Sequence, residues 1–244
     1  MKIIYGWETI PTMHHPVATV GSYDGVHRGH QVLIGEVVRR AAAVGGEALV
    51  LTFEPHPRIT LQQCENFHLL SLVEEKAALL EQYGVDYMVV IPFDERFSRL
   101  SHEEFIGDYI IGRLGIKELV VGYNHRFGHN KSGNYDYLTT KECELKVTEV
   151  VQHTVDDNKV SSTIIRQVIE SGDMAHAEHL SGHPYIIIGM TDEDGCVKPE
   201  SPYKLLPPAG EYEASVNGTP SRVEIQADGT IRTNVQNIKA IIEL

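Results

Sequence analysis

Cysteine and long apolar runs are scarce in this chain of 244 residues. The three cysteines, Cys64, Cys143 and Cys196, are an odd number at wide spacing without a CxxC pair, which fits neither a disulfide framework nor a zinc site. No run of about 18 apolar residues occurs, and the amino-terminal MKIIYGWETIP lacks the pattern of a secretory signal. These features predict free thiols in a soluble, cytoplasmic protein.

Positive charge is also in short supply, because 21 Lys and Arg stand against 34 Asp and Glu and give a formal net charge of −13. A field of this sign repels the backbone of nucleic acids and anionic membrane surfaces. We therefore expect small-molecule ligands, no nucleic-acid partner and no membrane partner, and we leave an oligomer open. The hydrophobic content of 42% is ordinary for a folded protein.

Short apolar runs alternate with segments of helical periodicity from residue 17 to about 181, as in βαβ units around a parallel sheet. Strands are expected at residues 17–21, 48–53, 87–92, 118–122 and 146–151. Helices are expected at residues 29–44, 74–83, 101–113 and 162–171, the third opening with a Ser101-x-x-Glu104 capping box. The predicted fold class is therefore α/β with a parallel sheet.

The pattern changes after about residue 182, where β signals follow one another without helices between them. They lie at residues 185–189, 211–216, 221–226 and 238–242. We expect two domains, residues 1–182 and a small all-β domain of residues 183–244. About 60 residues alone are marginally stable, so the second domain is expected to pack on the first.

The segment VGSYDGVHRGH at residues 20–30 joins the first predicted core strand to the following helix. Ligands of open parallel sheets bind at such carboxyl ends of strands. Gly21 permits a tight exit from the strand, Asp24 can cap the helix, and Gly29 has no side chain to obstruct a nucleotide.

His27 and His30 lie three residues apart in this segment, which places them on one face of a first helical turn. The free amides of a helix amino terminus and two histidine donors favour a bound phosphate. A Walker A loop needs Lys followed by Ser or Thr, and neither follows these glycines, so kinase-type P-loop chemistry is unsupported.

The segment GSYDGVHRGH resembles the HxGH motif of the nucleotidylyltransferase superfamily, in the GxFDGVHxGH form of bacterial FAD synthetases, with Tyr23 in place of the usual Phe. These are the adenylyltransferase half of bifunctional riboflavin kinase/FMN adenylyltransferases. Three further segments match that family in order: TFEPHP at residues 52–57, VGYNHRFG at 121–128 and VSSTIIR at 160–166. The resemblance implies a Rossmann-like nucleotidylyltransferase sheet with helices on both faces, followed by a small β domain.

The second and third motifs are interpreted as binding loops. In TFEPHP, Pro55 and Pro57 stiffen a loop that holds His56 out toward a substrate, which the resemblance makes the flavin side; the alternative is a rigid turn only. In VGYNHRFG, Asn124 can bond a nucleotide or serve as a turn former, and Arg126 can pair with anions. A histidine, residue 125, stands where that family usually has an aromatic residue.

The fourth motif, VSSTIIR, is interpreted as a helix start. Ser161 or Ser162 can cap the helix, Thr163 and the first-turn amides offer donors to an anion, and Arg166 lies one turn further on the same face. The resemblance assigns this helix start to the β- and γ-phosphates of ATP.

FAD synthetases transfer AMP from ATP to the phosphate of FMN by in-line displacement and release pyrophosphate. The resemblance thus implies FMN and ATP as substrates, with Mg²⁺ accompanying ATP and no protein ligand assigned to the metal. The expected catalytic residues are His27, His30, Asn124 and Arg166. The expected binding residues are Gly21, Ser22, Tyr23, Asp24, Gly29, Pro55, His56, Pro57, Arg126, Ser161, Ser162 and Thr163.

The carboxyl-terminal part departs from the bifunctional members. Residues 181–189 and 206–216 resemble segments of the riboflavin kinase module, but MTDEDGCVKPESPYK at 190–204 stands where its GRxxGxPTAN segment belongs. We expect a shortened module without riboflavin kinase activity. Two other functions remain open: an HxGH transferase acting on another phosphorylated acceptor, and a catalytically silent paralogue that binds flavin or nucleotide for regulation.

Overall fold

The computed structural model describes residues 1–62, 67–123, 125–140, 145–151, 154–155 and 158–244, which form two compact units. Unit 1 contains Met1–Tyr23, Gly29–Phe67 and Ala77–His153, and unit 2 contains Asp24–Arg28, His68–Lys76 and Thr154–Leu244. Two short segments of the amino-terminal half thus belong to the carboxyl-terminal unit. The boundaries expected from sequence, 1–182 and 183–244, stay a prediction.

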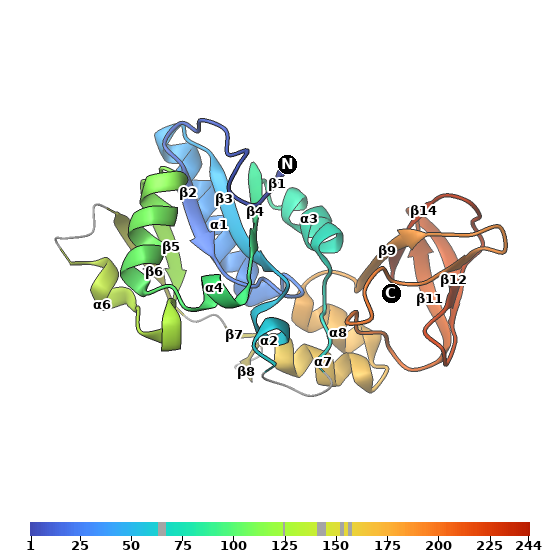
Figure 1. Cartoon of the computed structure of the whole chain (residues 1–244). Coiled ribbons are helices and arrows are strands. Elements are labelled where there is room, and N and C mark those ends of the chain that lie inside the picture. The colour runs from blue at the N-terminus through green and yellow to red at the C-terminus, as the bar shows by residue number, and fades with distance from the viewer. Residues whose placement is uncertain (63–66, 124, 141–144, 152–153, 156–157) are drawn as a thin grey trace. The chain divides into compact units, whose positions relative to one another are not determined.

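Unit 1 is built around a six-stranded sheet, in which all neighbouring strands are parallel (Figure 1). Its order is β1-β4-β3-β2-β5-β6. The strands are β1 (Lys2–Tyr5), β2 (Val17–Val20), β3 (Ala48–Glu54), β4 (Tyr87–Pro92), β5 (Glu118–Gly122) and β6 (Lys146–Val150). The five strands predicted from sequence are confirmed. Strand β1 escaped prediction because it is a short edge strand with only one buried residue, Ile4, and so carries no apolar run.

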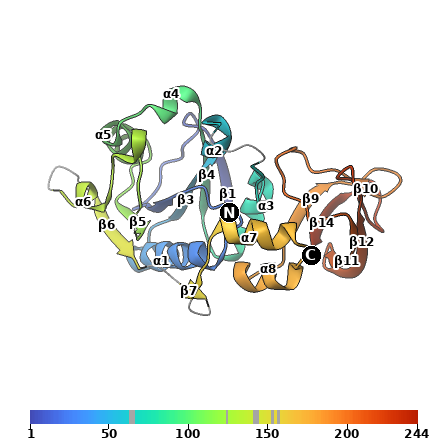
Figure 2. The same cartoon turned by 90° about the horizontal axis from the view of Figure 1, so that it is seen from below.

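Helices cover both faces of this sheet, as predicted (Figure 2). On one face α1 (Arg28–Val44) packs Val37 and Ala41 against the strands. On the other, Phe105, Ile106 and Ile110 of the π-helix η1 (Phe105–Arg113) enter the main core. The other helices of this region are α2 (Pro57–Thr60), α3 (Val73–Gln82), α4 (Glu95–Ser98), α5 (His102–Glu104), the 3-10 turn η2 (His129–Lys131) and α6 (Tyr135–Leu138).

The predicted capping box opens α5, which continues into η1. The Ser101 hydroxyl accepts a hydrogen bond from the Glu104 amide at 3.1 Å, and the Glu104 carboxylate accepts one from the Ser101 amide at 2.8 Å. Both bonds satisfy amides that have no partner within a helix. The helix ends before Gly115, whose φ of +62° suits a glycine.

The strand order places a topological switch point beside β2. Successive strands β3 and β4 are added on one side of β2, whereas β5 and β6 lie on the other. In open parallel sheets a crevice forms where the order reverses, outside the carboxyl ends of the strands. The motif at residues 20–30 leaves β2 there, and VGYNHRFG leaves β5.

Unit 2 combines a helix pair, α7 (Ser162–Glu170) and α8 (Met174–Ser181), with an antiparallel sheet of order β10-β13-β12-β11-β14-β9. Its strands are β9 (Ile186–Met190), β10 (Cys196–Val197), β11 (Gly210–Val216), β12 (Thr219–Ile225), β13 (Ile231–Arg232) and β14 (Lys239–Glu243), beside a small pair, β7 (Thr154–Val155) and β8 (Asn158–Lys159). The helix at 162–171 and the four predicted β segments are confirmed. Helix α8 and the two-residue strands β10 and β13 were not predicted.

The described residues contain no helix with the length and apolar character needed to cross a bilayer.

Candidate active site

The histidine loop, residues 21–27, connects β2 to α1 and begins with a packed aromatic side chain. A Cβ on Gly21 would lie 3.1 Å from the ring of Tyr23, so the glycine permits this close approach. The Tyr23 hydroxyl lies 2.5 Å from the Thr19 hydroxyl, and its ring meets His30 edge-on at 5.1 Å between centroids. Burial raises the pKa of Tyr23 far above its usual range. The Tyr23 side chain thus packs inside the protein.

Three residues of the loop adopt left-handed backbone conformations, Tyr23 (φ +47°), Gly25 (φ +79°) and Val26 (φ +39°). A β-branched residue at positive φ is a strained outlier, and such strain concentrates at functional sites. Val26 is fully buried, and a Cβ on Gly25 would lie 2.7 Å from Leu70. Close packing in unit 2 therefore holds the loop in a conformation that the chain would not adopt alone.

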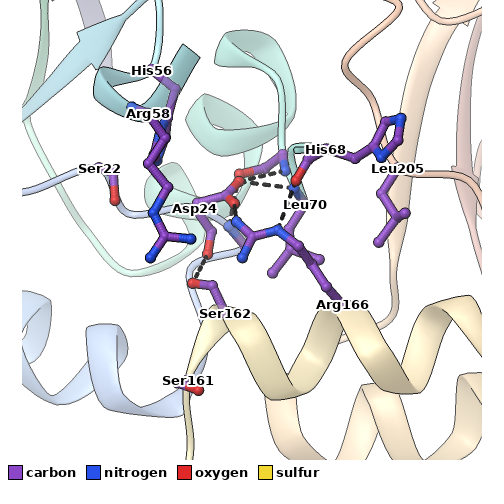
Figure 3. Close-up of polar contacts among 12 residues, drawn as sticks. Ser22, Asp24, His56, Arg58, His68, Leu70, Ser161, Ser162, Arg166 and Leu205 are labelled. Carbon is purple, nitrogen blue, oxygen red and sulfur yellow. Dashed lines mark hydrogen bonds and ion pairs between the residues drawn. The ribbon is translucent and has the colours of Figure 1, made fainter. Parts of the chain in front are cut away.

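Asp24 is the main polar anchor of the loop (Figure 3). One carboxylate oxygen accepts hydrogen bonds from the amides of Leu70 and Ser71 at 2.9 and 3.0 Å, and the other pairs with the Arg166 guanidinium. The Ser162 hydroxyl donates to the Asp24 carbonyl oxygen at 2.9 Å. The expectation that Asp24 caps the following helix is therefore wrong, because the buried carboxylate bonds to distant segments instead.

Arg166 and the serines at the start of α7 lie in the same network. Arg166 donates a further hydrogen bond from Nε to the His68 carbonyl at 2.7 Å, so its guanidinium joins Asp24 to a second segment. Ser161 caps α7 as predicted by accepting from the Ile164 amide, and Thr163 is exposed in the first turn. The contact of these residues with ATP phosphates stays a prediction.

His27 ends the loop directly before α1 and is 7% exposed. Burial lowers its pKa to about 4, although the nearby Asp24 carboxylate acts in the opposite direction. The imidazole is therefore neutral at pH 7, with one N–H donor and no charge. His30 and Gly29 follow in the first turn of α1, where His30 is partly buried.

Further contacts within unit 2 secure the backbone of residues 24–28. The Gly25 amide donates to the Ser71 hydroxyl at 2.8 Å, and its carbonyl lies 3.0 Å from Nε2 of His183. Arg28 donates from Nε to the His179 carbonyl at 2.9 Å. Sequence reasoning missed Ser71 and His179, which lie in no motif, and also His183, whose segment, residues 181–189, was related only to the riboflavin kinase module.

A cavity of about 700 Å³ in unit 1 begins at the carboxyl end of β2. Its walls include five phenylalanines, Phe53, Phe93, Phe97, Phe105 and Phe127. Its cationic side chains are Arg58, Arg126 and Lys131. An apolar pocket with a few polar groups is the usual form of a small-molecule site. Sequence reasoning missed Phe93 and Phe97, although their spacing of four just after a strand was a usable signal.

The TFEPHP loop contributes to this cavity in a different way from that expected. His56 is 8% exposed, its Nδ1 accepts a hydrogen bond from the Arg58 amide at 3.1 Å, and its ring packs on Phe67 at 4.9 Å. His56 is therefore covered and not held outward as expected, but its ring caps α2 and lines the cavity, and its contact with a substrate stays a prediction. Pro57 is the first residue of α2 and also lines the cavity, whereas Pro55 is exposed.

The VGYNHRFG loop forms another wall. His125 stacks on Phe127 with 5.9 Å between ring centroids, and burial lowers its pKa to about 4. A Cβ on Gly133 would lie 2.5 Å from the Phe127 ring, which makes glycine necessary at that wall. Arg126 is exposed at the cavity, and the predicted catalytic residue Asn124 lies outside the described residues.

Across the described ranges, no group of three or more His, Cys, Asp or Glu side chains is placed to hold a metal ion.

Comparisons with known proteins agree with the sequence motifs. The FAD synthetase family model matches residues 10–164. A FAD synthetase from Listeria monocytogenes is 33% identical over 232 residues, which cover 91% of this chain and 92% of that protein. A bifunctional riboflavin kinase/FMN adenylyltransferase from the same organism is 33% identical over 202 residues, or 78% of this chain and 62% of that protein. The chain thus spans less than two thirds of that bifunctional relative.

Among solved structures, a protein from Streptococcus pneumoniae described as a macrolide-efflux protein superposes with a TM-score of 0.83. The match covers 100% of this chain and 89% of that one at 22% sequence identity. At this identity the likeness concerns the fold alone.

Proposed function

The chain belongs to the FAD synthetase family, and from that membership we propose that it is an FMN adenylyltransferase, which forms FAD and pyrophosphate from FMN and ATP. The observation that carries the proposal is the position of the histidine loop. It leaves β2 at the switch point of the sheet, where the cavity with aromatic and cationic walls also begins. A nucleotidyl transfer to a phosphorylated aromatic acceptor needs both features.

In the proposed reaction a phosphate oxygen of FMN attacks the α-phosphorus of ATP. The bond from this phosphorus to the bridging oxygen breaks, and pyrophosphate leaves with that oxygen and its electron pair. The attacking oxygen is already anionic, so no general base is needed, and catalysis rests on positioning and charge stabilisation. Neutral His27 would donate its N–H to an α-phosphoryl oxygen, with His30 as the second donor.

The cavity supports FMN as the acceptor. Its phenylalanine walls suit the flat isoalloxazine ring, since offset and edge contacts between aromatic rings are favourable. Arg58, Arg126 and Lys131 supply positive charge for the FMN phosphate. ATP would enter as its Mg²⁺ complex, with its β- and γ-phosphates at the start of α7 beside Ser161, Ser162 and Thr163, as the family resemblance implies.

We further propose that this chain does not phosphorylate riboflavin. The reason is a difference in sequence. Residues 190–204 read MTDEDGCVKPESPYK where the family's kinase module has a GRxxGxPTAN segment. Of those residues, Cys196 and Val197 form the short strand β10.

The test is a chromatographic assay of the purified protein with ATP and Mg²⁺, offered FMN in one reaction and riboflavin in another. We expect FAD from FMN and no product from riboflavin. Replacing His27→Ala should lower kcat by roughly 100- to 1,000-fold, the usual effect of removing one donor to a transition-state oxyanion. The matched control is His176→Ala, which removes an exposed histidine of α8 and should leave kcat unchanged.

The other outcomes point to other functions. FMN formed from riboflavin would overturn the assignment of the carboxyl-terminal unit. Transfer to a different phosphorylated acceptor, with FMN inert, would favour another HxGH transferase. Tight binding of flavin or ATP without turnover would favour a regulatory paralogue.

A further inference from the structure

A buried lysine of unit 2, Lys204, donates three hydrogen bonds from its ammonium group. Lys204 Nζ donates to the Leu70 carbonyl at 2.8 Å, the Ile186 carbonyl at 2.8 Å and the Glu75 carboxylate at 2.7 Å, and its side chain has no exposed surface. The ammonium also lies 4.3 Å from the centroid of the Tyr185 ring. All three ammonium protons are thus engaged, which fixes the direction of each bond.

Glu75 extends this arrangement into the antiparallel sheet. Its two carboxylate oxygens accept from the Ile188 amide of β9 at 3.1 Å and from the Leu72 amide at 2.7 Å. The neighbouring backbone is paired as well, because the Leu69 amide donates to the Tyr203 carbonyl at 2.6 Å. Residues 68–76 are therefore tied to the sheet by charged and neutral hydrogen bonds alike.

Residues 68–76, which bond to the sheet, also contact the histidine loop. Leu70 accepts from Lys204 through its carbonyl and donates to Asp24 through its amide, at 2.8 and 2.9 Å (Figure 3 shows Leu70 and Asp24). Asp24 lies three residues before His27. A continuous chain of contacts therefore runs from Lys204 through one residue, Leu70, to the loop that carries His27.

We propose that Lys204 is a positioning residue for adenylyl transfer, which acts with Glu75 through Leu70 and Asp24 to hold the histidine loop in place. This inference rests on the proposed function. It gives the segment between β10 and β11 a role that needs no kinase chemistry, because Lys204 of that segment, together with Glu75 of α3, links β9 to the histidine loop.

The physical reason lies in what a buried ion pair contributes. Replacing such a pair by uncharged residues of similar volume is often neutral for stability, whereas removing one partner alone costs about 3–5 kcal/mol. A gain in the free energy of unfolding therefore does not explain why the Lys204–Glu75 ion pair is present. Its directional bonds fix the geometry of Leu70, which an apolar pair of the same volume would leave free to shift.

The test compares the wild type with the double variant Lys204→Met/Glu75→Gln, which removes both charges at similar volume. Steady-state kinetics with FMN and ATP are measured well below the unfolding temperature of each protein. We expect kcat to fall by at least 10-fold while KM for FMN stays within about 2-fold, because the cavity belongs to unit 1. The matched control, Lys198→Met, removes an exposed lysine paired with Asp228 and should match the wild type.

A second measurement needs no turnover. NMR titration of the imidazoles reports the pKa of His27, which burial lowers to about 4 in the wild type. A loosened loop exposes His27, so in the double variant this pKa should rise toward 6.5. If this double variant does not fold, Lys204→Leu/Glu75→Gln, which also removes both charges and leaves no unpaired buried charge, is used in both measurements.

Each outcome has a separate meaning. An active wild type and a folded variant with unchanged kcat overturn the inference and leave the proposed function standing. A fall in kcat with an unchanged His27 titration also overturns it, because the effect would not run through the loop. A wild type that makes no FAD contradicts the proposed function, and the His27 titration still decides whether Lys204 positions the loop.

Discussion

This chain has Tyr23 where the family pattern has a phenylalanine. A residue of the preceding strand, β2, bonds the additional hydroxyl. The usual phenylalanine needs no polar partner, whereas a buried tyrosine hydroxyl does. Thr19, four residues earlier on β2, supplies it, and both side chains are almost completely buried. The extra hydroxyl at residue 23 is thus matched by a hydroxyl at residue 19.

This pairing predicts how the two residues respond to substitution. Tyr23→Phe leaves the buried Thr19 hydroxyl without this partner and should lower the free energy of unfolding by about 1–2 kcal/mol. The double variant Thr19→Val/Tyr23→Phe removes both hydroxyls and should recover most of that loss. Urea unfolding of the two variants measures the difference. A double variant no more stable than Tyr23→Phe would contradict the pairing.

At the scale of elements, the β11–β12 hairpin shows how local sequence determines a turn. Asn217 (φ +51°) and Gly218 (φ +77°) join paired residues Val216 and Thr219, and an Asn-Gly pair with both φ values positive is the preferred two-residue hairpin turn. The Asn217 side chain also accepts from the Ile241 amide at 2.8 Å, which fastens the turn to β14.

Gly218 and Gly35 form a matched pair for testing backbone conformation. A Cβ at either position meets no atom within 4 Å, but Gly218 is left-handed and Gly35 lies in α1. Gly218→Ala should therefore lower the free energy of unfolding by about 1 kcal/mol or more. Gly35→Ala should raise it by up to about 1 kcal/mol. Chemical denaturation measures both, and shifts of the same sign would refute the argument.

For the whole molecule, histidines kept neutral in the folded state make stability depend on pH. The pKa of His27 is lowered to about 4 from 6.5 by burial, and that of the partly buried His125 is also lowered to about 4. Between these pH values the unfolded chain binds protons that the folded chain does not. The free energy of unfolding therefore falls as the pH drops below about 6.5, and this contribution levels off below about 4.

The contribution of His27 can be isolated by substitution. By pH 5 it should amount to about 2 kcal/mol relative to pH 7, since each pKa unit corresponds to about 1.4 kcal/mol. Urea unfolding at pH 7, 6 and 5 should show this loss in the wild type and a loss smaller by about 2 kcal/mol in His27→Gln. An identical pH dependence in the two proteins would show that His27 is not held neutral by burial.

The parts of the fold that follow from near neighbours in the chain were predictable. Helical periodicity located α1 and α7, a serine and a glutamate three residues apart identified the start of α5, and the motif order indicated the family. Elements too short to show a period, such as β1, β10 and β13, gave no usable pattern. The outward placement of His56 was wrong because its contact with Phe67 was invisible in the sequence.

The sequence by itself determined the α/β class, the order of the motifs and the loop that carries His27. Only the tertiary structure decided what holds that loop. Asp24 and Arg166 are 142 residues apart in the chain, and Glu75 and Lys204 are 129 apart. Periodicity and turn propensity act over a few residues, whereas these bonds exist because folding brings distant segments together, away from water, where charged groups need partners.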